Sequence, residues 1–252
     1  MPLSAATDMT IKVGVLGAKG RMGAEVCRAI EADDDLELVA RVDEDDSLKE
    51  LTTAGAEVAV DFTIPAVVKD NIRFCLDNGI HVVVGTTGMT DEDLADVSGW
   101  AKSSEANAFV APNFALGAVL MMRFAAEAAP FFRSAEISER HHERKLDAPS
   151  GTALRTASLM NDAREEPWPE SPDKETLEGS RGGDADGIRI HSLRVRGSVA
   201  HQEVVLGTDG ETLTIRHDSL DRASFMPGVV LAVKKVASLD GLVVGLEHLL
   251  DL

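Results

Sequence analysis

The segment from Glu139 to Thr152, E-R-H-H-E-R-K-L-D-A-P-S-G-T, concentrates side chains that can carry out acid–base chemistry. Two adjacent histidines, His141 and His142, precede Lys145 in a chain whose formal net charge is −18. Ser150, Gly151 and Thr152 then supply hydroxyls and backbone N–H groups in a form that often opens a helix and binds an anion. These groups suit an anionic ligand that also needs a proton, because imidazole titrates near neutral pH. The alternative is a solvated loop in which the histidines only fill hydrogen-bonding positions.

A second candidate site is a glycine-rich loop, G-A-K-G-R-M-G, which follows a short apolar run near the amino terminus. Glycines let the backbone approach a pyrophosphate, which then lies at the N-terminus of the next helix. Asp43 follows the next predicted strand about 20 residues after the last glycine, the spacing expected for a carboxylate that binds a ribose. The alternative is a tight turn without a ligand. The loop consists of Gly17, Ala18, Lys19, Gly20, Arg21, Met22 and Gly23.

The acidic residue at the end of this strand also bears on the choice of cofactor. A carboxylate accepts hydrogen bonds from a ribose 2′-hydroxyl but repels a 2′-phosphate. No cation immediately follows Asp43, so the sequence predicts NADH as the preferred cofactor, with NADPH possible because Lys19 and Arg21 could weaken the preference. Residues 44–46 are interpreted as a solvated acidic loop.

Two further short motifs follow predicted strands. Gly85, Thr86, Thr87 and Gly88 come after the strand at 81–84, and Ala111, Pro112, Asn113 and Phe114 come at the end of the strand at 108–111. Ligands of parallel sheets bind outside the carboxyl ends of the strands, where small residues would let a nicotinamide ring lie against the backbone. Either motif could instead be a simple turn.

The first half of the chain alternates apolar runs with amphipathic segments, which predicts an α/β fold with a doubly wound parallel sheet of the Rossmann type. Strands are predicted at 11–17, 36–42, 58–62, 81–84 and 108–111, and helices at 21–32, 67–78 and 91–103.

The pattern changes after Asn113 and predicts a second domain of α+β type with a mixed or antiparallel sheet. The expected elements are helices at 116–129 and 152–163, a strand at 135–139, a long exposed loop at 164–187 and three β-rich runs at 188–195, 200–206 and 212–217. A helix at 226–238 and an apolar tail at 246–252, which could pack on the first domain, close the chain. We therefore expect a dinucleotide-binding domain at 1–112 plus 222–252 and a second domain at 113–221.

Composition limits the possible partners. The net charge of −18 argues against nucleic acid as the main partner, because a phosphate-binding face needs clustered Lys and Arg. No apolar run approaches the length of a membrane span, and the first ten residues lack the basic start and apolar core of a signal peptide. Cys27 and Cys75 are predicted to be buried thiols, which fits a reducing cytosol and a cytoplasmic location.

Several of these motifs, taken together and in order, resemble the 4-hydroxy-tetrahydrodipicolinate reductase family, long called dihydrodipicolinate reductase. They are G-A-K-G-R-M-G, D-F-T-x-P at 61–65, G-T-T-G, A-P-N-F and, above all, H-H-x-x-K-x-D-A-P-S-G-T. A-H-Q-E at 200–203 and T-L-T-I-R-H-D-S-L-D-R at 212–222 are similar to the actinobacterial branch. The resemblance implies reduction of 4-hydroxy-tetrahydrodipicolinate to tetrahydrodipicolinate, with hydride from NAD(P)H, on the route to diaminopimelate and lysine. It also implies a homotetramer that acts on a small dicarboxylate, in which the domain at 113–221 binds the substrate and forms the tetramer.

The resemblance further implies the roles of individual residues. The family's catalytic pair matches His141 and Lys145, and its substrate contacts match His142, Ser150, Gly151 and Thr152. Its cofactor contacts match Gly17 to Met22, Asp43, Gly85 to Thr87 and Ala111 to Phe114. No metal is implied. In the expected reaction Lys145 donates a proton while hydride is added, and His141 donates or relays one.

Two positions depart from the family's pattern. Many members carry Arg directly after the ribose-binding acid and a second Arg within D-F-T-x-P, where this chain has Glu44 and Ile64. Both substitutions remove a cation suited to a 2′-phosphate, which supports the prediction of NADH.

Three alternatives remain open at the level of sequence. A dehydrogenase of similar layout acting on aspartate- or homoserine-like substrates would share the glycine loop, but it gives no reason for H-H-x-x-K beside S-G-T. A non-catalytic NAD-sensing regulator would need a DNA-binding helix pair or a basic face. A zinc site on His141 and His142 would require adjacent histidines to ligate one metal without a nearby Cys.

Overall fold

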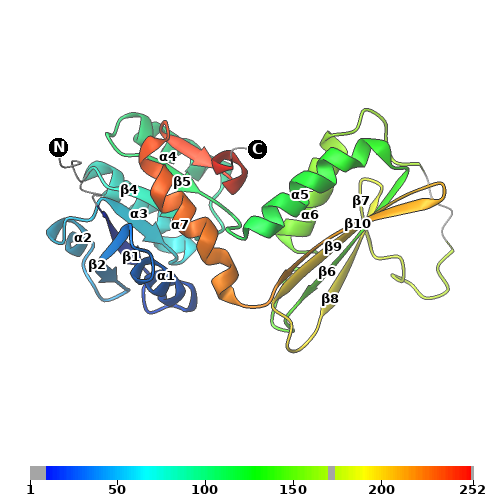
Figure 1. The fold of residues 1–252 in the computed structure, drawn as a ribbon, viewed down its shortest axis with the longest axis horizontal. Coiled ribbons are helices and arrows are strands. Elements are labelled where there is room, and N and C mark those ends of the chain that lie inside the picture. Colours follow the sequence, from blue (N-terminus) through cyan, green and yellow to red (C-terminus); the bar gives the residue numbers. More distant parts are fainter. Residues whose placement is uncertain (1–9, 170–173, 251–252) are drawn as a thin grey trace, which may run out of the picture. The chain divides into compact units, whose positions relative to one another are not determined.

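The computed structural model describes residues 10–169 and 174–250 (Figure 1). Its chain divides into two compact units. Among the described residues, the first contains those up to Phe114 together with those from Phe225 onward, and the second contains those within Ala115–Ser224. The sequence analysis placed the corresponding boundaries two and three residues earlier, after residues 112 and 221.

The first unit is built on a parallel sheet whose order, among the described residues, is β11-β5-β4-β3-β1-β2. Its central strands are nearly continuous apolar runs: β3 is V-A-V-D, and all four of its residues are buried. Such runs are typical of a parallel sheet covered on both faces. The predicted doubly wound sheet is therefore confirmed. The strands are β1 (Ile11–Leu16), β2 (Leu36–Val42), β3 (Val58–Asp61), β4 (His81–Val84), β5 (Ala108–Val110) and β11 (Leu242–Val244).

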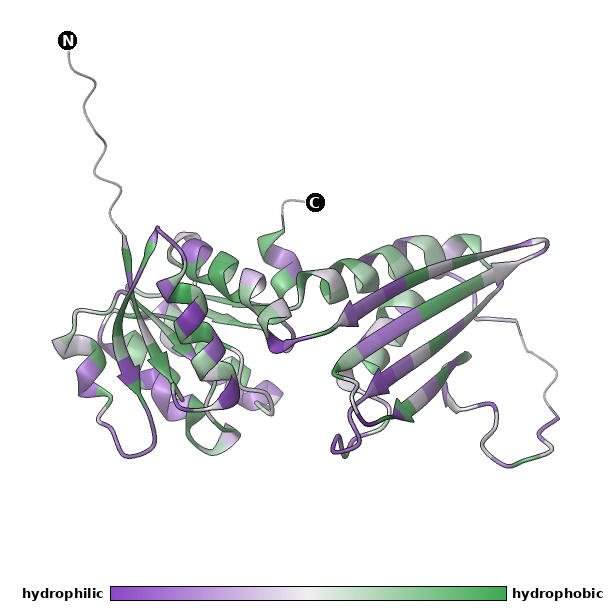
Figure 2. Ribbon diagram, turned by 60° about the horizontal axis from the view of Figure 1, so that its bottom comes forward, coloured by the Kyte–Doolittle hydropathy of each residue, from purple (hydrophilic) through white to green (hydrophobic). Residues whose placement is uncertain are grey.

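Helices cover both faces of this sheet. Helices α3 and α4 pack together over a core that includes Ile72 of α3 and Val97 of α4, while α1 packs against α7. Figure 2 shows the hydrophobic strands inside this unit and the mixed character of its helices. Cys27 and Cys75 are buried and unpaired, as predicted, and burial raises the pKa of the Cys75 thiol to about 12. The helices are α1 (Arg21–Glu31), α2 (Lys49–Thr53), α3 (Pro65–Asp77), α4 (Asp91–Lys102) and α7 (Met226–Lys235).

Two elements of the first unit, β11 and α2, were not predicted from the sequence. Strand β11 has three residues and α2 has five, so neither is long enough to show a hydrophobic period. The predicted apolar tail is partly a 3₁₀ turn in which Leu246 and Leu249 are buried, and its residues 251–252 lie outside those described. The 3₁₀ turns of the whole structure are η1 (Ala129–Phe131), η2 (Arg222–Phe225), η3 (Val236–Ser238) and η4 (Leu246–Leu249).

The second unit contains a mixed sheet with the order β10-β9-β6-β8-β7 among the described residues. Strands β6 and β8 are parallel, and the other pairs are antiparallel, which confirms the predicted α+β domain. Hydrophilic and hydrophobic residues alternate along the long strands (Figure 2). The strands are β6 (Ser134–His141), β7 (Gly183–Ala185), β8 (Ile188–Arg194), β9 (Ala200–Thr208) and β10 (Glu211–Ser219).

Two helices, α5 (Leu116–Ala128) and α6 (Gly151–Asp162), cover one face of this sheet (Figure 1). Their small residues, such as Ala125 and Ala157, pack on Ile137 and Leu206, which alternate with outward-facing polar residues. The face that carries Ile137 is therefore the core face.

The boundaries of two predicted elements were wrong in this unit. Strand β6 runs on to His141, two residues beyond its predicted end at Glu139, so the first histidine lies on a strand rather than in a loop. The predicted loop at 164–187 contains β7, and its residues 170–173 lie outside those described.

Among the described residues, no helix is both long and apolar enough to cross a membrane.

Candidate functional site

The glycine loop after β1 can be built only with glycine at two positions. Gly17 has φ of +75°, and a Cβ there would lie 2.7 Å from the carbonyl oxygen of Phe62. A Cβ on Gly23, in the first turn of α1, would lie 2.0 Å from the carbonyl oxygen of Gly17. The helix can therefore begin close to the loop, and its N-cap, Gly20, brings no capping side chain. A helix start of this kind favours a phosphate group.

Replacing Gly23 by Ala should weaken binding of a dinucleotide such as NADH by about tenfold or more, because the new Cβ would meet backbone atoms and push α1 away from the loop. Isothermal titration calorimetry of NADH with the purified variant measures this loss. The matched control is Gly99→Ala in α4, where a Cβ would meet no atom within 4 Å. That variant should bind NADH as the unmodified chain does, and a normal affinity in Gly23→Ala would contradict the role of the loop.

Asp43 is held in place at the end of β2 by two backbone groups. Its carboxylate accepts hydrogen bonds from the N–H groups of Lys19 at 2.6 Å and Glu44 at 3.0 Å. These bonds lower the pKa of Asp43, so the group is ionised at neutral pH. Each carboxylate oxygen retains a second lone pair, so the side chain can still accept hydrogen bonds from a ribose.

A cavity of about 510 Å³ lies beside this carboxylate. Three carboxylates line it, those of Asp43, Glu44 and Asp46, and none of its described lining residues is Lys or Arg. The Lys19 ammonium lies 3.6 Å from Asp46. Exposed Ile64, at 59% relative exposure, lines the same cavity. The residues fit the adenosine half of a dinucleotide, and their charge is unfavourable for a 2′-phosphate.

The strand-end loops of β3 and β4 are joined by a buried acid that the sequence analysis did not single out. Asp61 has no exposed surface and accepts hydrogen bonds from the Thr63 N–H at 2.9 Å, the Asn71 amide at 2.8 Å and the Thr86 hydroxyl at 2.8 Å. The hydroxyl of Thr86 is therefore used within the fold. A ligand beside this loop would meet its backbone and Thr87, which is exposed.

Aromatic rings fill the space next to these loops. A Cβ on Gly85 would lie 2.2 Å from the ring of Phe62, so only glycine leaves room for that ring. The Phe62 ring lies 5.8 Å from that of Phe114, and the Phe114 ring lies 6.0 Å from that of Phe109. Ala111 donates its N–H to the carbonyl of Val84, which ties the end of β5 to the end of β4.

A second group of predicted residues gathers at the end of β6 in the other unit. Nδ1 of His141 lies 2.5 Å from the carboxylate of Glu139, which is fully buried. Burial lowers the pKa of His141 below its usual value, and Glu139 offsets part of that shift. The positive charges of Lys145 and Arg194 repel a protonated ring and lower the pKa of His141 further. His141 is therefore neutral at neutral pH in this structure.

Lys145 and His142 follow directly after this strand. The Lys145 ammonium lies 2.8 Å from the carboxylate of Asp147, whose pKa it lowers. The Lys145 N–H donates to the carbonyl of His142 at 3.1 Å. Nδ1 of His142 is buried and has no hydrogen-bond partner among the described residues. A buried ring nitrogen without a partner is a position where a ligand group would be stabilising.

The S-G-T motif begins helix α6, as predicted. The Ser150 hydroxyl accepts a hydrogen bond from the Ala153 N–H at 3.2 Å and caps the helix. Gly151 and Thr152 form its first turn, where the helix dipole favours a carboxylate. The Ser150 N–H donates to Glu139 at 3.2 Å, so the helix start is tied to the strand that carries His141.

The predicted residues thus form two groups, one in each unit. The expected cofactor residues lie at the carboxyl ends of β1, β2, β4 and β5, and the expected catalytic and substrate residues lie between β6 and α6. The sequence analysis predicted no role for Glu139, Arg194 or Asp61, which hold these groups in place. One signal was available for Glu139: on a strand it shares a face with His141, two residues on.

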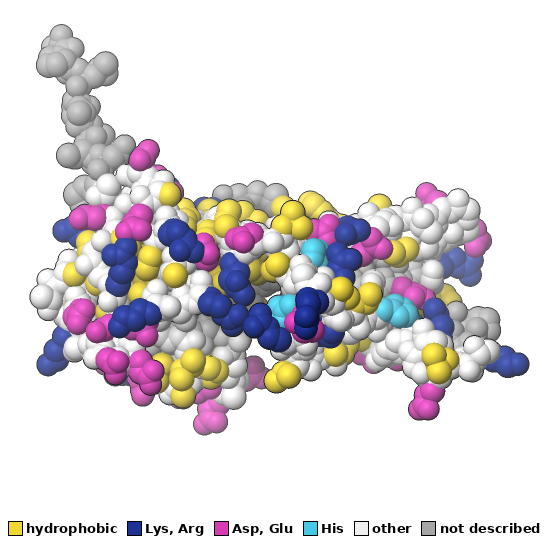
Figure 3. Space-filling model, turned by 90° about the horizontal axis from the view of Figure 1, so that it is seen from below, with side chains coloured by type: hydrophobic (Ala, Val, Ile, Leu, Met, Phe, Trp, Pro, Cys, Tyr) yellow, Lys and Arg dark blue, Asp and Glu magenta, His cyan; other side chains and the backbone are white. Residues whose placement is uncertain are grey.

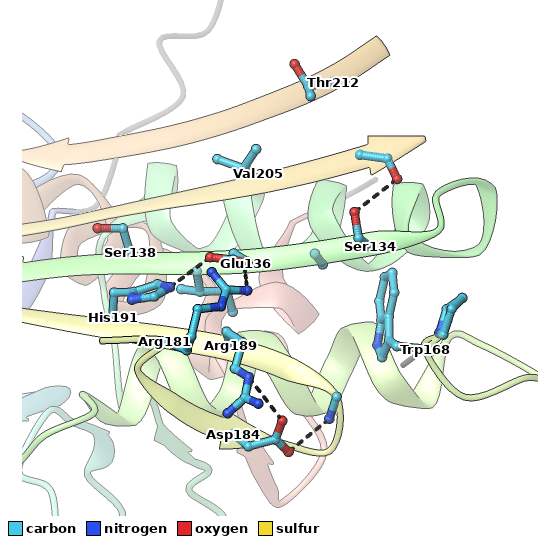
Figure 4. A pocket seen from close by; sticks show the side chains of 15 residues that line it. Ser134, Glu136, Ser138, Trp168, Arg181, Asp184, Arg189, His191, Val205 and Thr212 are labelled. Atoms are coloured by element: carbon cyan, nitrogen blue, oxygen red, sulfur yellow. Dashed lines mark hydrogen bonds and ion pairs between the residues drawn. The ribbon is translucent and has the colours of Figure 1, made fainter. Parts of the chain in front are cut away.

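A separate cavity of about 570 Å³ lies on the face of the mixed sheet that α5 and α6 leave open (Figure 4). Glu136 points into it and pairs with Arg181 at 2.5 Å and His191 at 2.8 Å. None of the predicted site residues lines this cavity.

On the molecular face shown in Figure 3, Lys and Arg side chains are interspersed with Asp and Glu. Among the described residues, no group of three or more His, Cys, Asp or Glu could hold a metal ion.

Comparison with known proteins identifies the family. Residues 11–114 match the family model of the N-terminus of dihydrodipicolinate reductase, and residues 117–250 match that of its C-terminus. This chain belongs to the dihydrodipicolinate reductase family. It is therefore an oxidoreductase of a family that depends on a pyridine nucleotide.

Relatives in this family are similar along nearly their whole length. The chain is 57% identical to the 4-hydroxy-tetrahydrodipicolinate reductase of Mycobacterium sp. (strain KMS), covering 96% of this chain and all of the relative. It is 56% identical to the enzyme of the same name from Corynebacterium aurimucosum, covering 97% of this chain and all of that one. A solved dihydrodipicolinate reductase from Paenisporosarcina sp. TG-14, with dipicolinate bound, is 41% identical and superimposes with a TM-score of 0.87, covering 96% of this chain and all of that one.

Proposed function

We propose that the chain reduces 4-hydroxy-tetrahydrodipicolinate to tetrahydrodipicolinate with a hydride from NADH, in the synthesis of diaminopimelate and lysine. The observation that carries this proposal is the group at the end of β6. There, two histidines and a lysine lie beside a capped helix N-terminus, in a chain that is acidic overall. The Lys145 ammonium and the start of α6 can attract a small dicarboxylate that the net charge of −18 would otherwise repel.

The reaction exchanges a hydroxyl for a hydride and needs one proton. The hydroxyl leaves as water with that proton, and the hydride takes its place on the ring carbon. The reduced nicotinamide supplies the hydride when the cofactor is bound. Lys145 is the proposed proton donor, because an ammonium near a substrate carboxylate keeps its proton until the transfer occurs.

The remaining residues of this group bind and orient the substrate. One carboxylate lies at the start of α6, where Ser150, Gly151 and Thr152 surround it, and His142 contributes the ring nitrogen that is buried without a partner. Hydrogen bonds between charged groups are short and directional, so this carboxylate fixes the ring relative to Lys145.

The cofactor is proposed to be NADH in preference to NADPH. Asp43 would bind the ribose hydroxyls, and the carboxylates of Glu44 and Asp46 lie around the same cavity. Gly17 to Met22 would hold the pyrophosphate, and Gly85 to Thr87 with Ala111 to Phe114 would line the nicotinamide. The Lys19 ammonium, 3.6 Å from Asp46, is already paired and adds little attraction for a 2′-phosphate.

The assembly is proposed to be a homotetramer formed through the unit Ala115–Ser224, as the sequence resemblance implies. Light scattering of the purified protein tests this, and a mass close to one chain of 26.8 kDa would contradict it.

The activity is tested by following NADH oxidation in a coupled reaction of aspartate semialdehyde, pyruvate and the upstream synthase. Oxidation that depends on all three components is the expected result, and dipicolinate should inhibit it competitively with the substrate. NADH oxidation with aspartate- or homoserine-like substrates instead would favour the alternative dehydrogenase. No oxidation with either would contradict the proposal.

A further inference from the structure

The fully buried carboxylate of Glu139 connects the elements of the proposed substrate site. Its Oε2 lies 2.5 Å from Nδ1 of His141 and accepts a hydrogen bond from Nη1 of Arg194 at 2.9 Å. Its Oε1 accepts a hydrogen bond from the Ser150 N–H at 3.2 Å. One side chain therefore joins the end of β6, strand β8 and the start of α6.

The guanidinium of Arg194 extends these contacts to the loop that carries Lys145. Its Nε donates to the carbonyl of Lys145 at 3.3 Å, and its Nη2 donates to the carbonyl of Asp147. Arg194 thus lies between the buried carboxylate and the loop backbone. Because a guanidinium is planar and presents its donors in a fixed arrangement, it sets the position of that backbone.

The pair of Glu139 and His141 also determines which ring nitrogen carries the proton. Burial opposes ionisation of Glu139, but hydrogen bonds from Arg194, Ser192 and His141 outweigh it and lower its pKa. An ionised carboxylate can only accept, so the contact of 2.5 Å requires a proton on Nδ1. Since the ring is neutral at neutral pH, its Nε2 carries a lone pair and is directed away from Glu139.

We propose that Glu139 is a positioning residue of the reductase, which keeps Nδ1 of His141 protonated and leaves Nε2 free to act as a proton relay that reprotonates Lys145. Through Arg194 it also places the loop that bears Lys145. The proposal rests on the proposed reaction and assigns a residue and a proton path to it.

The relay works in two steps whose protons balance. Nε2 of His141 first takes a proton from solvent, and the ionised Glu139 stabilises the resulting imidazolium. After Lys145 has given its proton to the reacting substrate, the imidazolium passes its own proton to the Lys145 amine. Each turnover thus uses one proton, and the ring returns to its neutral form with Nδ1 still protonated. The charged groups around the ring are Glu139 on β6, Arg194 on β8 and Lys145, paired with Asp147, on the following loop.

Strand β6 also supplies a matched control. Glu136 lies on the opposite face of the sheet and, like Glu139, pairs with one arginine and one histidine, Arg181 and His191 (Figure 4). The substitution Glu136→Gln removes a comparable carboxylate at a distance from the proposed substrate contacts.

In the kinetic test, Glu139→Gln should lower kcat about tenfold or more at neutral pH, because removing the charge next to His141 disfavours its protonated form. The basic limb of the kcat–pH profile should move to lower pH, whereas the KM for NADH should stay the same. Glu136→Gln should change neither, with light scattering checking the assembly of every variant. An unshifted profile in Glu139→Gln, even with a lower melting temperature, would overturn the relay.

If Glu139→Gln does not fold, the protonation of His141 can still be measured without it. Nitrogen-15 NMR of the unmodified chain at neutral pH, with His141→Gln used to assign one of the seven histidines, should show His141 protonated at Nδ1. Protonation at Nε2 instead would overturn the proposal whatever the activity. If His141 is protonated at Nδ1 but the protein has no reductase activity, the proposed function is contradicted, whereas the effect of Glu139 on the His141 ring is not.

Discussion

Replacing Lys145 by Ala is expected to lower kcat by about 10²- to 10⁴-fold, the range for loss of a positioned general acid. The affinity for NADH should stay the same, because Lys145 and the glycine loop belong to different units. Stability should change by about 1 kcal/mol or less, since the Lys145–Asp147 pair includes an Asp147 side chain that is 60% exposed. Stopped-flow turnover, NADH titration and thermal melting measure the three quantities.

The variant Lys145→Arg distinguishes the two roles of Lys145, which are attraction of the substrate by its charge and donation of its proton. A guanidinium keeps the positive charge that attracts a dicarboxylate, but it does not release a proton at neutral pH. Lys145→Arg should therefore bind dipicolinate more tightly than Lys145→Ala and still turn over slowly. Lys102→Ala, on the exposed last turn of α4, is the control for removing a lysine and should have normal kcat. Normal turnover in Lys145→Ala would show that another group supplies the proton.

The fold could be predicted from the sequence because each hydrophobic pattern that indicates it lies within a single strand or helix. The apolar runs of β1 and β3 and the helix-period pattern of α1 predicted the doubly wound sheet, because burial on both faces leaves a continuous apolar run in each strand. Strand β11 could not be predicted in this way, since its three residues gain their partners only from β5, more than a hundred residues earlier.

The candidate site was predictable where its chemistry is local. Ser150 could be predicted as a helix cap from its own neighbours, and Asp43 from its spacing after the glycine loop. Arg194 could not, because it reaches Glu139 and the Lys145 loop only through the parallel pairing of β8 with β6. Asp61 was missed for a similar reason: its partners come from α3 and from the loop after β4.

The second large effect concerns the cofactor. The variant with both Glu44→Arg and Ile64→Arg should raise the ratio of kcat/KM for NADPH to that for NADH by about 100-fold or more. Both positions line the cavity beside Asp43, and each new guanidinium can form a charge-assisted hydrogen bond with a 2′-phosphate. Such a bond contributes about 1.5 to 3 kcal/mol, and about 1.4 kcal/mol corresponds to a factor of ten.

Matched variants show whether the new ratio comes from charge or from shape. Glu44→Gln removes one repulsive charge without adding a donor and should raise the ratio only slightly, while Ile64→Met keeps the size and polarity of the side chain and should leave it unchanged. The gain of the double variant should shrink as salt is added, because both arginines lie at an exposed rim of the cavity. If the double variant has the same ratio as the unmodified chain, the 2′-position of the ribose lies elsewhere and Asp43 is not the residue that binds it.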